Sequence, residues 1–170
     1  LEEIRSILDL NVAEYPDPRE LAATLLATLA GLRRSELRAL RWRDVDAQNH
    51  RIIVSQGYTD GDGFHEAKAD SGGAIEVPAV LLERLAQYKK WTPFDHDDHL
   101  LLFGASEGGR IRSVSNWQRN SATGHTPMAA RAVTRGFNRV LAAIGVDDAE
   151  RKRRNLVLHS GRHTFASLAT

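Results

Sequence analysis

Two segments that lie far apart in the sequence carry side chains able to bind a phosphate group. Residues 31–37 read GLRRSEL, and residues 159–167 read HSGRHTFAS. Each segment places an arginine, Arg33 or Arg162, at a predicted helix start, and the second adds His159. A guanidinium presents a planar fork of donors that fits two oxygens of one phosphate, and a helix start adds free N–H groups and a favourable dipole. If the fold brings the segments together, they predict a phosphate clamp.

The two segments together resemble the signature boxes of the tyrosine recombinases, the phage integrase family. That family carries a G-L-R-x-S-E-L box early in its catalytic domain and an H-x-x-R-H-T-F-A box late. The resemblance spans almost the whole chain. It is specific because both boxes occur in the right order, with an arginine-rich helix and a lysine-bearing hairpin between them.

The resemblance implies metal-free cleavage of DNA by a tyrosine hydroxyl, which leaves a 3′-phosphotyrosyl link and a free 5′-hydroxyl. It implies that the full-length protein performs site-specific DNA recombination or integration, as a homotetramer on duplex DNA. The implied catalytic residues are Arg33, Lys68, His159 and Arg162. The two arginines would stabilise charge on the non-bridging oxygens, Lys68 would protonate the leaving oxygen, and His159 would help to move the tyrosine proton.

Each of these assignments has a simpler alternative. Lys68 could be an exposed lysine in a turn, and His159 could be an ordinary packed or exposed histidine. The late box also departs from the family pattern, because Ser160 and Gly161 stand where the family commonly has aspartate and leucine. The loss of that leucine removes a packing anchor for Arg162.

The tyrosines of this chain do not match the nucleophile of the family, which follows the late box. Tyr15, Tyr58 and Tyr88 all come earlier. We therefore expect residues 1–15 to be a linker with an N-terminal helix and residues 16–170 to be an integrase catalytic domain that stops before the nucleophile. Such a fragment is expected to be inactive in cleavage by itself.

The hydrophobic pattern predicts an α+β fold that is mainly α-helical, with a small three-stranded antiparallel sheet. The resemblance implies that this is the fold of the tyrosine recombinase catalytic domain. Helices are expected at 2–10, 19–29, 33–41, 80–91 and 126–144. Strands are expected at 51–55, 64–67 and 73–77, forming a meander. Residues 99–103 are expected to form a brief buried segment.

Further arginines lie on the predicted helices. Arg131, Arg135 and Arg139 share one face of the last helix, which is either solvated or faces phosphates. Arg34, Arg38 and Arg43 are expected to be solvated or paired with nearby acids, namely Glu36, Asp44 and Asp46.

The charge distribution favours a polyanionic partner, although a solvated basic surface would give the same count. The net charge is only +1, yet residues 1–109 carry −7 and residues 110–170 carry +8. The absence of cysteine excludes disulfides and thiolate metal sites and fits the cytoplasm of a bacterium or a phage-infected host. No apolar run is long enough to span a membrane, so no membrane association is expected.

No cofactor, metal or small-molecule substrate is expected, because nucleotide-binding motifs are absent. Residues 95–99 read DHDDH, which we interpret as a solvated acidic loop rather than a metal site. The main alternative function is a non-catalytic DNA-binding accessory or regulatory protein with the recombinase fold. Type IB topoisomerases and telomere resolvases share the chemistry but not this pair of boxes, and a helical interaction domain without a nucleic-acid role is a third possibility.

Overall fold

The structure is a computed structural model that describes residues 2–68, 72–105 and 123–158. Its helices are α1 (Glu2–Asp9), α2 (Pro18–Leu29), α3 (Arg34–Ala39), the short 3-10 helix η1 (Trp42–Asp44), α4 (Ala79–Trp91), α5 (Ala130–Ala143) and α6 (Asp148–Arg153). Its strands are β1 (Val45–Asp46), β2 (Arg51–Val54), β3 (Gln56–Thr59), β4 (Gly63–Glu66) and β5 (Gly73–Glu76). The predicted mixture of helices with small antiparallel sheets is confirmed.

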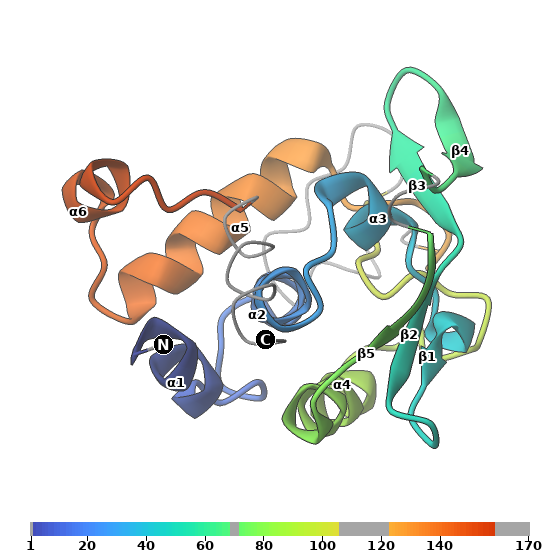
Figure 1. Ribbon diagram of the computed structural model, residues 1–170, viewed down its shortest axis with the longest axis horizontal. Coiled ribbons are helices and arrows are strands. Elements are labelled where there is room, and N and C mark those ends of the chain that lie inside the picture. The colour runs from blue at the N-terminus through green and yellow to red at the C-terminus, as the bar shows by residue number, and fades with distance from the viewer. Residues whose placement is uncertain (1, 69–71, 106–122, 159–170) are drawn as a thin grey trace.

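Helix α2 lies at the centre of the molecule, with α1, α3, α4 and α5 packed around it (Figure 1). Its start is set by Asp17, whose side chain accepts a hydrogen bond from the Arg19 N–H, and by Pro18 in the first turn. Its end is set by Gly31, whose φ of 64° is the left-handed conformation expected after a helix. Every residue of α2 is buried, as expected for a helix enclosed on all sides.

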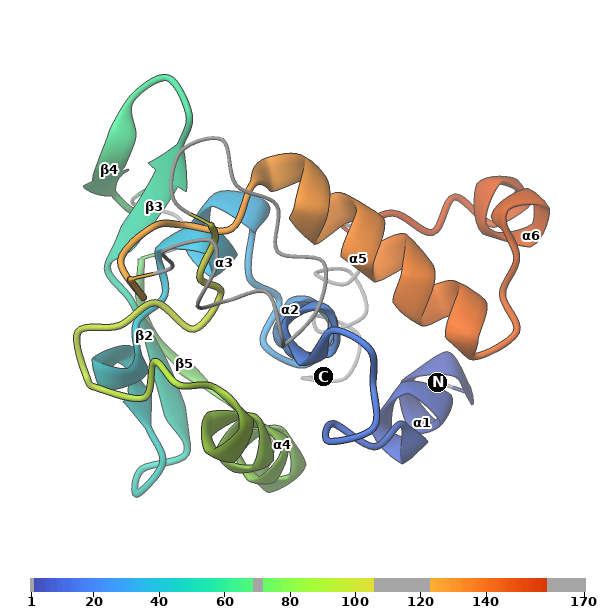
Figure 2. The ribbon, with the colours of Figure 1, turned by 180° about the vertical axis from the view of Figure 1, so that it is seen from behind.

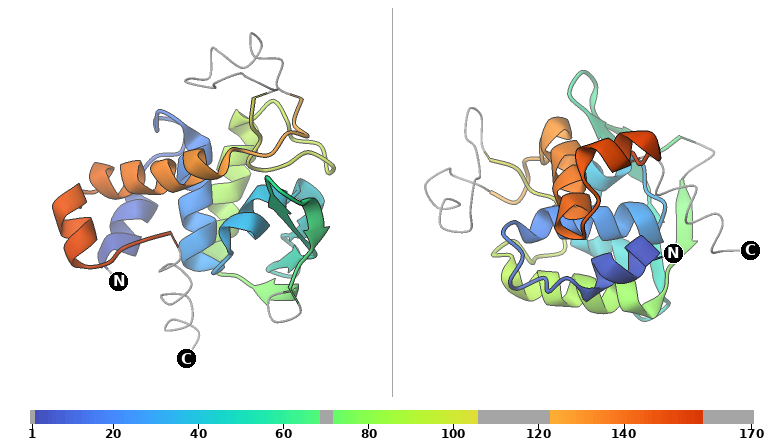
Figure 3. Two further views of the ribbon diagram at one scale, coloured as in Figure 1. Left: turned by 90° about the horizontal axis from the view of Figure 1, so that it is seen from above. Right: turned by 90° about the vertical axis from the view of Figure 1, so that its left-hand side faces the viewer.

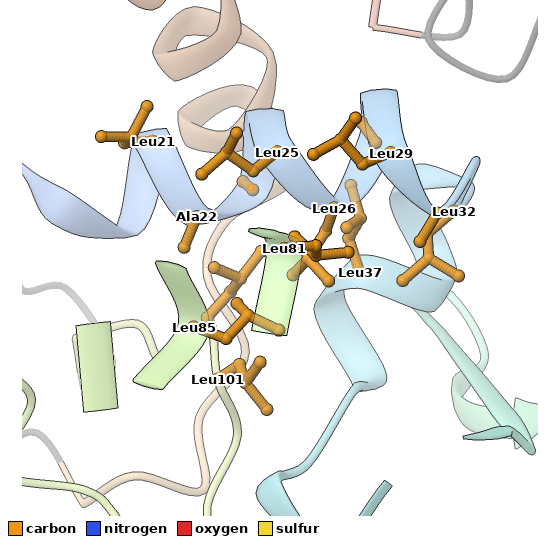
Figure 4. Close-up of a cluster of buried hydrophobic side chains, with 14 of the residues drawn as sticks. Leu21, Ala22, Leu25, Leu26, Leu29, Leu32, Leu37, Leu81, Leu85 and Leu101 are labelled. Atoms are coloured by element: carbon orange, nitrogen blue, oxygen red, sulfur yellow. The ribbon is translucent and has the colours of Figure 1, made fainter. Parts of the chain in front are cut away.

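The hydrophobic core is built on both sides of α2. Leu21, Leu25 and Leu29 line one side, and Ala22 and Leu26 lie on the other, toward α4 and α3 (Figure 4). Leu21 and Leu26 are fully buried, and each such leucine stabilises the fold by about 1.5–3 kcal/mol. Leu100, Leu101, Leu102 and Phe103 are also fully buried, which confirms the predicted buried segment.

The strand pairing differs from the predicted meander. A three-stranded antiparallel sheet is present, but its order is β1-β2-β5, and β4 pairs with β3 in a separate two-stranded hairpin. The chain from β2 runs on into β3 with one residue between them, so β4 pairs with β3 and leaves β2 to pair with β5. The meander was wrong because residues 56–59, which carry Gly57, were not recognised as a strand.

Two helices differ in length from the prediction because backbone groups pair across the fold. Helix α3 ends at Ala39 rather than residue 41, since the Leu40 carbonyl accepts a hydrogen bond from the Leu101 N–H at 3.0 Å. Helix α5 starts at Ala130 rather than residue 126, since Pro127 forms a bridge with Phe103. Extended pairing satisfies backbone groups of the buried segment 100–103, which a longer helix would leave unpaired.

The β3–β4 hairpin projects from the body of the molecule beside α3, as both opposite views show (Figures 1 and 2). Helix α5 crosses over α2 (Figure 3), and α6, which the pattern did not predict, follows it. In the residues described, no helix is both long and apolar enough to cross a membrane.

Candidate active site

Arg33 lies at the N-terminus of α3, as the early box predicts. Its backbone N–H donates to Glu36 Oε2 at 2.7 Å, and its Nη1 lies 3.7 Å from Glu36 Oε1. The Glu36 side chain is only 5% exposed, whereas that of Arg33 is 26% exposed. The buried carboxylate therefore holds the backbone and the guanidinium of Arg33 while leaving part of the guanidinium open to solvent.

Arg33 opens onto a cleft of about 310 Å³. The cleft is lined by Leu32, Arg33, Arg34, Thr134, Val157 and Leu158. Leu158 directly precedes His159, so the cleft beside the early arginine reaches the residue before the late box. His159 and Arg162 themselves lie outside the described residues, and their roles stay predictions.

Lys68 follows strand β4 by two residues and is exposed. The residue before it, Ala67, donates its N–H to the Ser55 carbonyl at 3.0 Å, and the Lys68 carbonyl accepts the Gly72 N–H at 2.9 Å. Val54 and Gln56 are two residues apart on the outgoing arm, while their partners Gly73 and Glu66 are seven apart on the return arm. Lys68 thus lies just past the end of β4, where the chain leaves the hairpin, at the predicted strand edge.

The hairpin that leads to Lys68 packs against the helix that follows Arg33. Within the hairpin, Gly57 leaves room for the side chain of His65, because a Cβ atom at this position would lie 2.8 Å from His65 Nε2. The structure therefore brings the elements that carry Arg33 and Lys68 into contact.

Arg38 and Arg43 have different partners from those expected. Arg38 is buried and donates to Asp60 Oδ1 at 2.6 Å and to the Met128 carbonyl at 2.7 Å. Arg43 pairs with Asp98 at 2.6 Å. Arg43 is exposed, as one of the two expectations had it, whereas Arg38 is neither solvated nor paired with an acid close in the sequence. No local pattern identifies Asp60 as a partner, since it lies 22 residues from Arg38.

Helix α5 presents a basic face beside a second, larger groove of about 740 Å³. Arg131 and Arg135 are exposed, and no hydrogen bond or ion pair engages either one within the described parts of the chain. Arg139 instead pairs with Glu20, donating from Nε at 3.0 Å, and the pairing keeps the pKa of Arg139 above its usual value. Two of the three arginines in the predicted row are thus available to an anionic ligand.

Two of the tyrosines are poorly suited to act as nucleophiles. Tyr88 is fully buried and its hydroxyl donates to the Leu101 carbonyl, and this burial raises its pKa. Burial and the nearby carboxylate of Glu20 raise the pKa of Tyr15 to about 12. A raised pKa disfavours the phenolate form that attacks phosphorus.

The DHDDH segment contributes to a cluster of three imidazoles. The His99 ring lies edge to face with those of His96 and His125, at centroid distances of 5.2 and 5.1 Å. Desolvation by burial lowers the pKa of His99, and the positive charges that His125 and His96 carry when protonated lower it further. Over the described ranges, no group of three or more histidine, aspartate or glutamate side chains is arranged to hold a metal ion.

Comparison with known proteins places these features in a family. Residues 1–168 match the sequence profile of the phage integrase family. No curated protein sequence matches the chain.

Solved structures share the fold. The crystal structure of XerA recombinase is 18% identical, with a TM-score of 0.60, and the match covers 99% of this chain and 48% of that one. A Tn1549 transposon integrase in complex with transposon right end DNA is 21% identical, with a TM-score of 0.58 and coverage of 97% and 50%. The same integrase with a circular intermediate DNA is 22% identical, with a TM-score of 0.61 and coverage of 97% and 50%.

This chain spans about half the length of those solved chains. The match to the family runs through both boxes and through the elements between them that pack around α2. The chain belongs to the phage integrase family.

Proposed function

We propose that this chain is the core of the catalytic domain of a tyrosine recombinase, which cleaves and rejoins duplex DNA at specific sites. Arg33, Lys68, His159 and Arg162 form its catalytic set. The full-length protein works as a homotetramer on cytoplasmic DNA, and its nucleophilic tyrosine lies outside residues 1–170. The proposal includes no metal, cofactor or small-molecule substrate.

One observation carries the proposal: Arg33 and Leu158 line the same cleft. They are 125 residues apart in the sequence, and the late box starts at the next residue. A clamp made of Arg33 and Arg162 requires the two boxes to lie close together, and the shared cleft supports that arrangement. The burial of Glu36 beneath Arg33 further supports a preorganised guanidinium, which is what transition-state stabilisation requires.

In the proposed reaction the tyrosine oxygen attacks the scissile phosphorus and forms a new P–O bond, while the bond from phosphorus to the 5′-oxygen breaks. Arg33 and Arg162 bind the non-bridging oxygens, where negative charge increases in the transition state. The tyrosine proton passes toward His159, and the leaving 5′-oxygen takes a proton from the Lys68 ammonium. The products are a 3′-phosphotyrosyl link and a 5′-hydroxyl.

The basic face of α5 supports DNA as the ligand. Arg131 and Arg135 are four residues apart, so they lie one above the other on one side of the helix. A pair of exposed guanidinium groups along a helix suits neighbouring backbone phosphates, which are the main source of affinity in protein–DNA contacts.

The catalytic assignment is tested by cleavage of a nicked suicide substrate, on which the covalent protein–DNA complex accumulates. In the full-length protein, Arg33→Ala should lower the yield by at least about 10²-fold, the usual effect of removing one preorganised donor. Arg43→Ala is the matched control, because Arg43 pairs with Asp98 on the surface. A normal yield of covalent complex from the Arg33→Ala protein refutes the clamp.

DNA binding is tested on the chain itself by titrating salt against a duplex of unrelated sequence. Arg131→Ala and Arg135→Ala should each weaken binding and reduce the slope of log K against log salt by about 1. Arg153→Ala serves as the control, since Arg153 pairs with Glu150 on α6. Salt slopes unchanged in both variants exclude α5 as a DNA-binding surface, and no binding at low salt favours an interaction domain without DNA.

A further inference from the structure

We propose that Arg38 is a positioning residue that fixes the Lys68-bearing hairpin against the helix that carries Arg33. The inference rests on the proposed function, in which Lys68 donates a proton to the leaving oxygen. The Arg38–Asp60 pair thus influences the reaction without contacting DNA.

Arg38 joins three segments through one buried guanidinium. Its side chain is only 4% exposed. Nη2 donates to Asp60 Oδ1 in the hairpin turn at 2.6 Å, and Nε donates to the Met128 carbonyl before α5 at 2.7 Å. The guanidinium carbon lies 4.8 Å from the ring centroid of Tyr58 in β3. Charge-assisted bonds in a desolvated setting are strong and directional, so these contacts fix the angle of the hairpin.

Other contacts at this interface are less directional. Arg41 lies over the ring of Phe64 in β4 at 5.2 Å, and both residues are partly exposed. The rest of the contact between α3 and β3 is packing of the two elements against each other. Such contacts permit small rotations of the hairpin. A rotation that separated the buried Arg38 guanidinium from a partner would instead leave a desolvated charge without its hydrogen bond, which costs free energy. Arg38 is therefore the contact that selects one hairpin orientation.

The hairpin transmits that orientation to Lys68. Tyr58 pairs with Phe64, Gln56 pairs with Glu66, and the Ala67 N–H then bonds the Ser55 carbonyl. Lys68 is the next residue. A rotation of the hairpin about its contact with α3 would shift the Lys68 backbone relative to Arg33, and a shift of about 1 Å is enough to cost up to about 10²-fold in rate.

The negative charge of the pair can be removed without leaving a cavity, which makes the inference testable. The Asp60 side chain is 72% exposed, so Asp60→Asn leaves no cavity. The Arg43–Asp98 pair is a matched control, because it has the same 2.6 Å separation and its aspartate is 70% exposed. Asp98→Asn removes the same charge from a surface pair whose side-chain bond runs to Arg43 in η1 and not to a residue of the hairpin.

The experiment measures single-turnover cleavage by the full-length protein on two substrates. One carries the natural 5′-oxygen, and the other carries sulfur in that bridging position. A thiol is far more acidic than an alcohol, so a thiolate leaves without needing a proton. A defect in proton donation therefore slows cleavage of the oxygen substrate and spares the sulfur substrate. A general loss of folding or of phosphate binding slows cleavage of both.

Lys68→Ala first tests the proposed function, since it should slow the oxygen substrate by about 10²-fold or more and leave the sulfur substrate near normal. Asp60→Asn should slow the oxygen substrate by about tenfold and change the sulfur substrate by less than about twofold. Arg38→Lys keeps the charge but lacks the guanidinium fork, and it should show the same selective loss. Asp98→Asn should change neither rate.

The contrary outcomes are separable. If Lys68→Ala is not rescued by sulfur, Lys68 is not the proton donor, and both the assignment and the inference fail. If it is rescued but Asp60→Asn and Arg38→Lys slow both substrates equally, or slow neither, only the inference fails. A selective loss in Asp98→Asn would trace the effect to charge and would also overturn the positioning role.

Discussion

Replacing Gly136 by alanine should destabilise the protein, although alanine is the better helix former. Gly136 lies in the middle of α5, directly over Glu20 of α2. A Cβ atom at this position would lie 2.7 Å from Glu20 Cγ and 2.9 Å from Glu20 Cβ. The Glu20 side chain is 4% exposed and is held by Arg139, so it has little room to move.

The expected magnitude comes from two opposing contributions. Alanine in place of glycine stabilises a helix interior by about 1 kcal/mol. Overpacking a buried site costs about 1–3 kcal/mol, and a displaced Glu20 would also weaken its bond to Arg139. We expect Gly136→Ala to lower the free energy of unfolding by about 1–2 kcal/mol. In a Glu20→Gly background the Cβ and Cγ atoms that the new side chain would meet are both gone, and Gly136→Ala should raise the free energy of unfolding by up to about 1 kcal/mol.

The assay is a double-mutant cycle measured by urea unfolding of the chain, followed by far-UV circular dichroism. The two backgrounds should differ by about 1–3 kcal/mol in the effect of Gly136→Ala, with unchanged m-values. The result also bears on function, because this contact sets how α5 lies on α2 and hence where its basic face points. An effect of the same sign and size in both backgrounds would refute the packing of Glu20 beneath Gly136.

Two further predictions concern Glu36 and His99. Glu36→Ala should cost about 1 kcal/mol or more of unfolding free energy, because the Arg33 N–H loses its acceptor, whereas Glu36→Gln should cost less. Equal losses in the two variants, measured by urea unfolding, would show that this hydrogen bond does not matter. The lowered pKa of His99 means that the unfolded chain binds its proton more readily, so stability should fall as pH drops through the usual histidine range, from about 7.5 to about 5.5. His99→Gln should flatten that part of the pH dependence, and an unchanged slope would exclude His99 as its source.

Several elements could be predicted from the sequence because their signals are local. Asp17 and Pro18 start α2 and Gly31 ends it, as their side-chain chemistry and backbone preferences dictate. The apolar periodicity of residues 80–91 was sufficient to identify α4. The early box likewise identified the helix start at Arg33, and the two boxes together identified the family.

Other features required the tertiary structure because each depends on a partner far away in the sequence. Helix α3 stops where Leu40 meets Leu101, and β2 pairs with β5 once β3 has taken β4. Arg38 looks like any helix-surface arginine until Asp60 and Met128 enclose it. Local sequence sets the backbone preferences of a segment. Which buried polar group finds which partner is decided only when the chain packs, because leaving such a group unpaired costs more than the local preference it overrides.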